Sequence, residues 1–329
     1  MAKILVTGGS GFIGIHLVSE LESRGHSVFN LDLKEPVNGK RIDFWIRGSV
    51  LDLNLLQNLV VTKGIEYIIH LAALAKQNAS SIEEFEVNIE GTRNVISTVN
   101  ANSCIKRVIY TSTQYVNSPG LAVPESLDKY QPYGFYGVSK LIGEFDVRDR
   151  SNKVNWLIIR PTAIWGEHHP VLTWGLWWQI YKKRYFHPSN DKAIKPYGFV
   201  KNTAWQIAEL IDCSNDNSHG STFYLADELV YQRSWVANFI TQLNGNHLTI
   251  PRTFLKALSK IGDVMIKMGV NFPLYSSRYN NLITSNPVDI FPIIDLLGIP
   301  PHRKEIAIEE VCAWLKLLYK EKGYISHAR

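Results

Sequence analysis

The sequence has few cysteines, no long apolar run and no block of charge of one sign. Its three cysteines form no C-x-x-C pair, which is typical of reduced thiols in a cytoplasm and speaks against structural zinc. The longest near-apolar run, YIIHLAALA, is too short to cross a bilayer, and the start of the chain lacks the pattern of a secretory signal. The net charge of +5 is scattered, which gives nucleic-acid binding little support. We therefore expect a cytoplasmic protein without membrane span, metal or nucleic-acid partner.

The composition is that of an ordinary folded protein. Of the 329 residues, 45% are hydrophobic and 20% are charged, so disorder is not expected. A chain of this length can bury one large core or two unequal ones. The sequence contains no repeat, low-complexity tract or flexible linker.

The first half alternates short β-branched runs with stretches of helical spacing. This alternation predicts a parallel sheet with helices on both faces. The predicted strands are Lys3–Thr7, Ser27–Leu31, Tyr67–Ala72, Arg107–Thr111 and Trp156–Arg160. The predicted helices are Ile13–Arg24, Leu53–Lys63, Ile82–Asn100 and Tyr136–Arg148.

The second half, beyond Gly166, has a different character. The stretch TWGLWWQIYKKRYF is crowded with aromatic residues, and helical patterns dominate from there to the end. The paired prolines of GIPPHRKE end the element before them, and a last helix is predicted over Ile308–Leu318. A further helical stretch carries an apolar stripe, which we interpret as core, made of Leu255, Leu258, Ile261, Met265 and Met268.

A glycine-rich turn, KILVTGGSGFIG, lies where the first strand gives way to a helix. Gly8 permits the tight turn, Gly11 lets the backbone approach a pyrophosphate, and Gly14 allows the helix to pack closely on the sheet. The exposed N–H groups at the start of the helix, around Phe12 and Ile13, and the helix dipole would then meet the anion. A glycine pattern alone is a weak signal, but here a strand and a helix flank it.

Asp32 ends the second strand, SVFNLDL, about twenty residues beyond the glycines. A carboxylate there can accept both hydroxyls of an adenosine ribose and would repel a 2′-phosphate. The glycine turn carries Ser10 and no arginine, so we favour NAD over NADP. The alternative is that Asp32 is a solvated turn residue.

The stretch YGFYGVSK places Tyr136 and Lys140 four residues apart, on one face of a predicted helix. An ammonium beside a phenol favours the phenolate and lowers its pKa, which makes the tyrosine a usable acid/base. The Tyr-x-x-x-Lys pattern alone is common by chance.

Taken together, seven motifs resemble the extended short-chain dehydrogenase/reductase superfamily, in particular its nucleotide-sugar epimerase/dehydratase branch. The likeness covers the first half of the chain closely. In order, the motifs are TGGSGFIG, Asp32, HLAA from His70, NIEGTRNV from Asn88, YTST from Tyr110, YGVSK, and RPTAIWG from Arg160.

The resemblance implies a Rossmann-type doubly wound α/β sheet over residues 1–166 that also recruits part of 200–226. It implies a smaller, mainly helical substrate domain over 167–329, and a homodimer formed through a four-helix bundle that includes the helix of Tyr136. NAD would contact Gly8, Gly11, Phe12, Ile13, Gly14, Asp32, Leu71, Ala72, Ala73 and Lys140.

By the same resemblance, Tyr136 is the general acid/base, Lys140 lowers its pKa and holds the nicotinamide ribose, and Thr113 hydrogen-bonds the substrate oxygen. This chemistry is reasonable, because a carbinol that loses a hydride must also give up its hydroxyl proton to a nearby base. Asn88 would tether the backbone of a neighbouring strand. His70 is interpreted as a core histidine with satisfied hydrogen bonds.

The residues after Thr113 reduce the number of reactions that the family resemblance allows. Family members that eliminate water or decarboxylate usually carry an acid there, whereas this chain has Gln114 and Tyr115. His168 and His169 could reach a substrate, although a loop pair is usually polar surface. We therefore expect a nucleotide-sugar 4-epimerase that works through a transient 4-keto intermediate. The alternative is a dehydrogenase or ketoreductase of a nucleotide sugar or of an apolar, sterol-like alcohol.

The resemblance weakens where relatives bind the substrate diphosphate. Ala163 replaces a common asparagine, and YGFVKN lacks a common arginine. We expect Thr113, Gln114, Tyr136 and Arg278 to bind the substrate. Lys195 and Lys201 are further candidates. The aromatic side chains of Trp174, Trp177, Trp178 and Tyr181 share a helical face, which could stack on a nucleobase, line an apolar pocket, dip into a membrane surface or pack as core.

Overall fold

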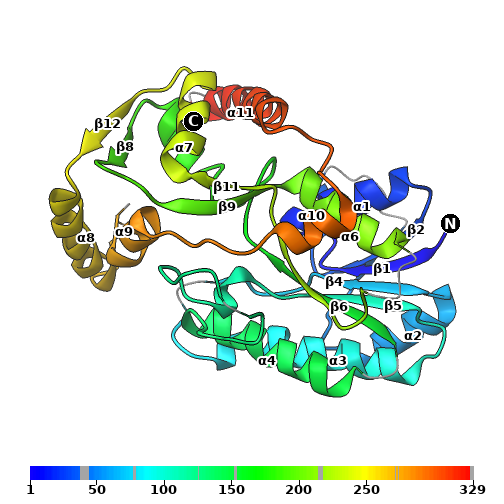
Figure 1. Cartoon of the computed structure of the whole chain (residues 1–329). Helices are drawn as coiled ribbons and strands as arrows, with labels where there is room; N and C mark the ends of the chain where they lie inside the picture. The colour runs from blue at the N-terminus through cyan, green and yellow to red at the C-terminus, as the bar shows by residue number, and fades with distance from the viewer. Residues whose placement is uncertain are drawn as a thin grey trace.

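The computed structural model of the chain describes residues 1–37, 44–76, 79–124, 126–151, 154–213, 218–270, 272 and 274–326. Its centre is a parallel seven-stranded sheet in the order β10-β6-β5-β4-β1-β2-β3 (Figure 1). The strands are β1 (Lys3–Thr7), β2 (Ser27–Asp32), β3 (Trp45–Arg47), β4 (Tyr67–His70), β5 (Arg107–Thr111), β6 (Asn155–Pro161) and β10 (Thr222–Leu225). The predicted fold class, a doubly wound α/β sheet, is therefore confirmed.

The strand order reverses at β1, which pairs with β2 on one side and with β4 on the other. After β1 the chain continues to β2 on one side of β1, and it later returns to β4 on the other side. The loops that follow the carboxyl ends of β1 and β4 therefore diverge. Ligands of open parallel sheets bind in the crevice that such a reversal creates.

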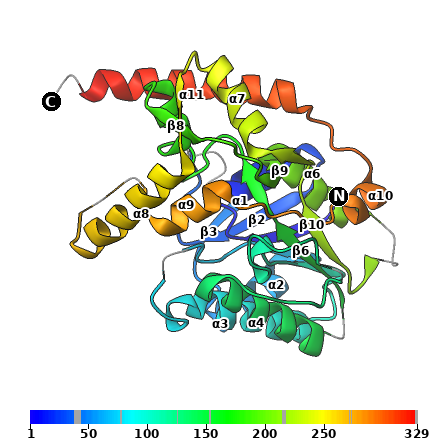
Figure 2. The same cartoon turned by 60° about the vertical axis from the view of Figure 1, so that its left-hand side comes forward.

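Helices cover both faces of the sheet, as Figures 1 and 2 show. One face is packed by α1 (Phe12–Ser23), α6 (Val200–Asp212) and α10 (Phe291–Leu297), and the other by α2 (Leu53–Lys63), α3 (Glu86–Ala101) and α4 (Gly134–Arg150). The β-branched runs are apolar on both faces because both faces are buried. The fully buried side chains of Ile4, Leu5 and Val6 in β1 illustrate this.

Several predicted elements differ in their bounds. The last helix, predicted over Ile308–Leu318, extends over Lys304–Ser326, and α4 begins at Gly134, two residues before the predicted start. The predicted helix Ile82–Asn100 begins as a 3-10 turn, η3 (Glu83–Phe85), and becomes α-helical only at Glu86. The predicted strand Tyr67–Ala72 ends at His70.

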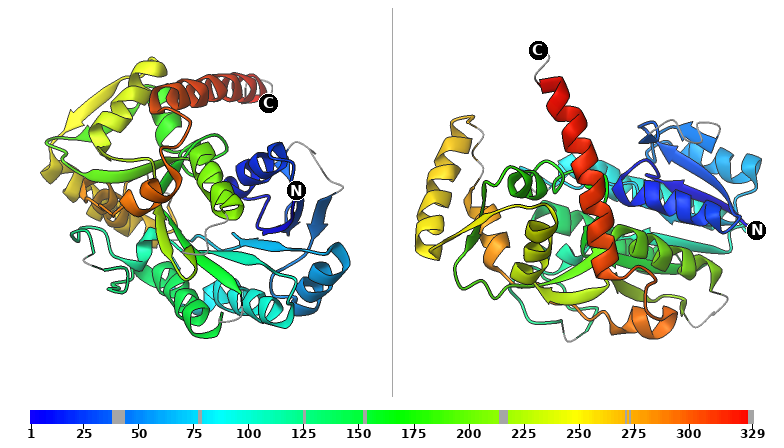
Figure 3. Two further views of the ribbon diagram at one scale, coloured as in Figure 1. Left: turned by 45° about the vertical axis from the view of Figure 1, so that its right-hand side comes forward. Right: turned by 90° about the horizontal axis from the view of Figure 1, so that it is seen from above.

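The second half holds two small sheets, whose strands the sequence did not predict. Figure 3 shows them beside the main sheet. One sheet has the order β11-β9-β7, and β12 pairs with β8 in the other. These strands are β7 (Ala163–Trp165), β8 (Tyr185–Pro188), β9 (Ile194–Phe199), β11 (Glu228–Tyr231) and β12 (His247–Ile250).

The helices of the second half are α5 (Leu176–Tyr181), α7 (Gln232–Gln242), α8 (Arg252–Lys267), α9 (Ser276–Ile283) and α11 (Lys304–Ser326). Trp177 is fully buried, and the rings of Trp178 and Tyr181 pack against Tyr319 of α11. Trp177, Trp178 and Tyr181 therefore pack as core, which is one of the roles proposed for this aromatic face. The remaining member, Trp174, is 42% exposed.

The apolar stripe on α8 is only partly core, so the sequence prediction was wrong for its outer residues. Leu255 is buried, but Ile261 is 56% and Met268 is 71% exposed. The reason is that α8 lies at the periphery and packs one face on α9 and on the segment at Leu274, so its other faces meet solvent (Figure 2). Of the described helices, none is both long and apolar enough to span a membrane.

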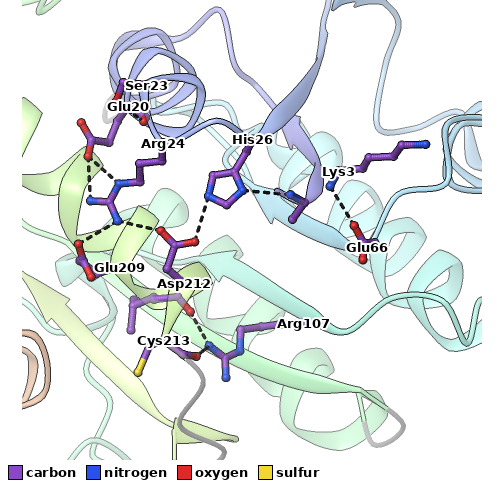
Figure 4. A network of polar contacts seen from close by, with 12 residues as sticks. Lys3, Glu20, Ser23, Arg24, His26, Glu66, Arg107, Glu209, Asp212 and Cys213 are labelled. Atoms are coloured by element: carbon purple, nitrogen blue, oxygen red, sulfur yellow. Dashed lines mark hydrogen bonds and ion pairs between the residues drawn. The ribbon is translucent and has the colours of Figure 1, made fainter.

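A polar network stabilises the amino-terminal edge of the sheet, as Figure 4 shows. Arg24 at the end of α1 pairs with Glu209 and Asp212 of α6 at 2.8 and 3.0 Å, and its guanidinium also contacts Glu20. Arg107 of β5 donates to the carbonyl of Cys213 at 2.8 Å. These bonds join α1, α6 and the sheet at the edge opposite the glycine-rich turn.

Candidate active site

The glycine-rich turn lies at the carboxyl end of β1, and its geometry requires glycine at two positions. Gly8 has φ +76°, and a Cβ there would lie 2.7 Å from the backbone nitrogen of Ala72. A Cβ on Gly14 would lie 2.3 Å from the carbonyl oxygen of Gly8. The turn therefore folds tightly against both the loop after β4 and its own helix.

The start of α1 is suited to bind an anion. Gly11 is the N-cap residue and has no side chain to satisfy the first N–H groups, which belong to residues such as Phe12 and Ile13. The first turn of α1 contains no acidic residue. Unpaired N–H groups and the positive end of the helix dipole fit the pyrophosphate of a dinucleotide.

Asp32 is fixed at the end of β2, beside the glycine-rich turn. One carboxylate oxygen accepts from the backbone N–H of Ser10 at 3.0 Å, and the other from that of Lys34 at 2.9 Å. Asn30 donates to the hydroxyl of Ser10 at 3.0 Å. The carboxylate is thus held where an adenosine ribose would lie if a pyrophosphate occupied the start of α1.

The loop after β4, from Leu71 to Ala73, runs along the other side of the glycine-rich turn. Asn88 on α3 fixes this loop, because it accepts from the N–H of Leu74 at 2.7 Å and donates to its carbonyl at 3.1 Å. The same amide donates to the hydroxyl of Ser139 at 3.0 Å, and Ser139 in turn donates to the carbonyl of Tyr136 at 2.8 Å. Asn88 therefore tethers the loop after β4, rather than a strand as predicted, and also ties this loop to α4.

Thr113 and Tyr136 come together in this site, where the threonine hydroxyl acts on the pKa of the tyrosine. Thr113 follows β5 and is buried, while Tyr136 lies in the first turn of α4 with its ring packed against Phe85 at a centroid distance of 6.0 Å. Burial raises the pKa of Tyr136 to about 12, and the interaction with the Thr113 side chain offsets part of that rise. Tyr115 raises it slightly further.

Lys140 is buried one turn further along α4. Burial lowers its pKa to about 8, and the nearby carboxylate of Glu144 raises it in part. The lysine borders an interior cavity with His70, Ser112 and Glu144. Burial, Thr113 and Tyr115 set the pKa of Tyr136 in this arrangement, and its lowering by Lys140 stays a prediction.

The glycine of YGVSK has a packing role. A Cβ on Gly137 would lie 2.3 Å from the carbonyl oxygen of Tyr115. That carbonyl also accepts from the N–H of Tyr133 at 2.8 Å. Only glycine allows α4 to approach the turn after Thr113 closely enough for the hydroxyls of Thr113 and Tyr136 to meet.

A cavity of about 220 Å³ lies between the turn after β5 and α9, and its lining includes none of Thr113, Tyr136 and Lys140. The rings of Tyr115 and Tyr133, 5.7 Å apart, form one wall. The facing wall belongs to α9, from which the sequence analysis singled out Arg278 but none of the residues that line the cavity. The lining residues are Tyr115, Pro119, Tyr133, Ser277, Asn280, Asn281 and Thr284.

Gln114 lies next to Thr113 and is buried. Its carbonyl Oε1 has no hydrogen-bond partner among the residues that the structure describes. A buried acceptor without a partner is costly, so it is a candidate to receive a hydroxyl of a substrate.

The three candidate cations lie in different places. Lys195 on β9 is buried, donates to Asn281 of the cavity wall at 3.1 Å, and has its pKa lowered to about 8 by burial. Lys201 pairs with Glu310 of α11 and so serves packing. Arg278 is exposed and its guanidinium lies beside Gly175, whereas the cavity wall is formed by its neighbours on α9.

The candidate histidines have structural roles. His70 is buried between the hydroxyls of Thr7 and Thr92, at 2.8 and 3.2 Å, and burial lowers its pKa to about 3, as expected for a core histidine. His169 accepts from the N–H groups of Val171 and Leu172 and so closes its own turn. Among the described residues no group of three metal-ligating side chains is assembled.

Together these features define a dinucleotide-binding α/β enzyme. They are the parallel sheet, the glycine-rich turn and the arrangement of Thr113, Tyr136 and Lys140. Residues 4–174, just over half of the chain, match the model of the NAD dependent epimerase/dehydratase family. The chain belongs to this family, which is of the extended short-chain dehydrogenase/reductase type, and its cofactor is NAD.

Its relatives differ in what they act on. Sterol-4-alpha-carboxylate 3-dehydrogenase, decarboxylating, of Mus musculus is 28% identical over 253 residues, which cover 74% of this chain and 69% of that protein. N-acetyl-alpha-D-glucosaminyl-diphospho-ditrans,octacis-undecaprenol 4-epimerase of Escherichia coli O157:H7 is 28% identical over 205 residues, or 61% of this chain and 60% of that protein. The UDP-glucose 4-epimerase of Thermus thermophilus, solved with NAD, has a TM-score of 0.71 at 18% identity and covers 95% of this chain and 99% of that chain.

Proposed function

We propose that the protein is an NAD-dependent epimerase that inverts C4 of a nucleotide-linked sugar through a 4-keto intermediate. The convergence of Thr113 and Tyr136 in one buried site, with Gln114 in place of an acid, is the observation that carries this proposal. The coarser family assignment does not depend on it.

Each residue has a distinct role in the proposed reaction. NAD held at the glycine-rich turn and Asp32 would supply a hydride acceptor for C4 and, after the keto sugar has turned over in the site, a hydride donor to its opposite face. Tyr136 takes the hydroxyl proton of the substrate as that hydride leaves and gives it back on reduction. Thr113 donates to the developing carbonyl oxygen. The charge of Lys140, one turn below, and that of the oxidised nicotinamide would both favour the phenolate.

Gln114 supports an epimerase over a dehydratase. Elimination of water needs a group that donates a proton to the leaving hydroxyl. An amide at position 114 has no such proton to give at neutral pH. It can instead accept from a sugar hydroxyl through its buried Oε1.

An assay with purified protein tests the proposal. The NAD-loaded protein is incubated with a panel of UDP-, GDP-, CDP- and dTDP-sugars, and the absorbance of NADH and the stereochemistry of the product are followed. We expect inversion at C4 without net NADH. Stoichiometric NADH without inversion would assign a one-way dehydrogenase instead.

Replacement of the proposed base gives the first mutational prediction. Tyr136→Phe should keep NAD binding and lose about a hundredfold or more in rate, because it deletes the acid/base hydroxyl. The matched control is Tyr67→Phe, which should keep the parent rate. Tyr67 is the first residue of β4 and so lies at the amino-terminal edge of the sheet, whereas the site lies at the carboxyl ends of the strands. Equal turnover by the two variants would remove Tyr136 from the mechanism.

A second candidate function is the oxidation or reduction of an apolar, sterol-like alcohol. The relative from Mus musculus is named for such a reaction, and the cavity is walled by two tyrosines and neutral polar residues rather than by cations. Turnover of sterol alcohols with stoichiometric NADH, and silence across the sugar panel, would favour it.

A further inference from the structure

Helix α8 presents three different faces along its length. Its buried face, with Leu255, Ser259 and Gly262, packs on α9 and on the segment at Leu274. A second face is apolar and exposed, and we call it the outer stripe. It consists of Phe254, Ala257, Ile261, Val264 and Met268, at steps of three and four residues.

The outer stripe exposes large side chains to an unusual degree. Phe254 is 59% exposed, Ile261 56% and Val264 57%. Such spacing places all five side chains on one side of the helix. Isolated exposed apolar residues are ordinary, but a continuous row of them marks an interaction surface.

The third face of α8 is positively charged. Lys256, Lys260 and Lys267 are exposed and follow one another at steps of four and seven, which makes a row beside the outer stripe. The one acidic residue of α8, Asp263, accepts from both the N–H and the hydroxyl of Ser276 on α9, at 2.9 and 2.5 Å. Asp263 also interacts with the charge of Lys267, whereas the other exposed charges of this face are positive.

We propose that α8 docks on the surface of an anionic lipid bilayer, with the outer stripe buried at the level of the acyl chains and the lysine row against the headgroups. An apolar face flanked by lysines is the pattern of a helix that lies in the plane of a membrane interface. The location of α8 allows this, because every view places it at the outer end of the molecule, away from the main sheet (Figures 1, 2 and 3).

Charge favours a lipid surface over a second copy of this chain. Two outer stripes could pack on each other, since steps of three and four also suit a helix pair. However, such a pair brings two lysine rows together, and the single acid of α8, Asp263, accepts from Ser276 and already interacts with Lys267 of its own helix. Anionic headgroups attract each lysine instead.

The docking surface lies close to the candidate substrate cavity. Tyr279 of α9 faces α8, and its hydroxyl donates to the carbonyl of Arg252 at 3.2 Å. Its neighbours Ser277 and Asn280 line the cavity. One helix therefore separates the proposed membrane surface from the cavity. The docking proposal does not rest on the proposed reaction.

Flotation with lipid vesicles tests the proposal. The full chain is mixed with vesicles of equal parts phosphatidylglycerol and phosphatidylcholine, and with vesicles of phosphatidylcholine alone. We expect it to float with the first, far less with the second, and less as salt is raised, because salt screens the lysines. Failure to float with the anionic vesicles would overturn the proposal.

Two variants separate the apolar and the charged contributions. Phe254→Ser/Ile261→Ser should lower the partition coefficient at least tenfold, because it removes the side chains that insert. Lys256→Gln/Lys260→Gln should lower it by about thirtyfold on anionic vesicles, or about fivefold per lysine, and leave it unchanged on neutral ones.

Matched controls replace equally exposed residues elsewhere. Val61→Ser/Leu317→Ser and Lys63→Gln/Lys320→Gln should float like the parent. Thermal unfolding and NAD binding of all variants check that the fold is kept.

Two further results would overturn the proposal. Equal flotation by the α8 and control variants would mean that α8 is not the docking surface. A lipid-free dimer that dissociates with Phe254→Ser/Ile261→Ser in sedimentation velocity, without loss of vesicle binding, would assign the stripe to a second copy.

Discussion

Lys140 shows how the site balances charge against burial. Its ammonium is buried, and the pKa of about 8 means that it keeps its proton at neutral pH but is close to losing it. Glu144 raises that pKa while it also forms a bidentate pair with Arg160 at 2.7 and 2.8 Å. The positive charge proposed to favour the phenolate of Tyr136 thus depends on a carboxylate that also stabilises the core.

Asp32 gives a prediction at the same scale. Asp32→Ala should relax the preference for NAD over NADP, because the carboxylate that would repel a 2′-phosphate is gone. It should also weaken NAD binding, since Ser10 loses the acceptor that fixes the glycine-rich turn. Dissociation constants for both cofactors, measured by fluorescence titration, check this.

Asp32→Asn is the matched control. It keeps an oxygen acceptor for Ser10 but removes the charge, so it should relax the preference with a smaller loss of NAD affinity. An unaltered preference in both variants would mean that the ribose is recognised elsewhere.

At the scale of elements, the approach of α4 to the turn after β5 decides whether Thr113 meets Tyr136. Gly137→Ala should force the two apart, because the new Cβ would lie 2.3 Å from the carbonyl of Tyr115. We expect at least a tenfold loss in rate and a loss of about 1–3 kcal/mol in the free energy of unfolding, as for overpacking elsewhere.

Gly143→Ala on the same helix is the control. Its Cβ would meet Thr92 at 3.7 Å, an ordinary contact, and alanine is the better helix former by about 1 kcal/mol. This variant should therefore keep its rate and unfold at an equal or higher temperature. If Gly137→Ala behaved in the same way, close packing at position 137 would not matter.

The elements that were predictable are those whose patterns are local. β-branched runs and helical spacing gave the strands and helices around the glycine-rich turn to within a few residues. β10 and the pairs β8–β12 and β9–β11 were missed because each four- to six-residue strand is defined by a partner far away in the sequence. Burial along α8 was missed because periodicity does not tell a core stripe from one on the surface.

The site shows the same division. The motifs brought Thr113, Tyr136 and Lys140 to one site, with Asn88 as the tether, since each lies within or beside a recognisable motif. Asn280 and Asn281 of the cavity wall lie in none. The roles of individual site residues, and pairing of two copies through α4, stay predictions.

At the scale of the whole molecule, buried neutral histidines set an acid limit to stability. Burial lowers the pKa of His70 to about 3, and those of His16 and His169 to about 4. The unfolded chain takes up protons near pH 6.5, whereas the folded one does not. Stability should therefore fall as pH drops below 6.5, by up to about 1.4 kcal/mol per pH unit for each histidine.

Denaturant unfolding between pH 7.5 and 5 measures this slope. His70→Gln should reduce the slope of the free energy of unfolding against pH by the equivalent of one proton, because it removes a buried neutral histidine. A parent chain whose stability stays flat below pH 6.5 would contradict the prediction.

The strand order has a consequence for synthesis. The outer side of β6 is covered by β10, which lies more than sixty residues further along the chain. A nascent chain that has emerged only as far as residue 166 therefore presents an open hydrogen-bonding edge with Ile158 and Ile159 beside it. Such an edge invites pairing with another chain, so a ribosome that stalls in this interval leaves an aggregation-prone fragment.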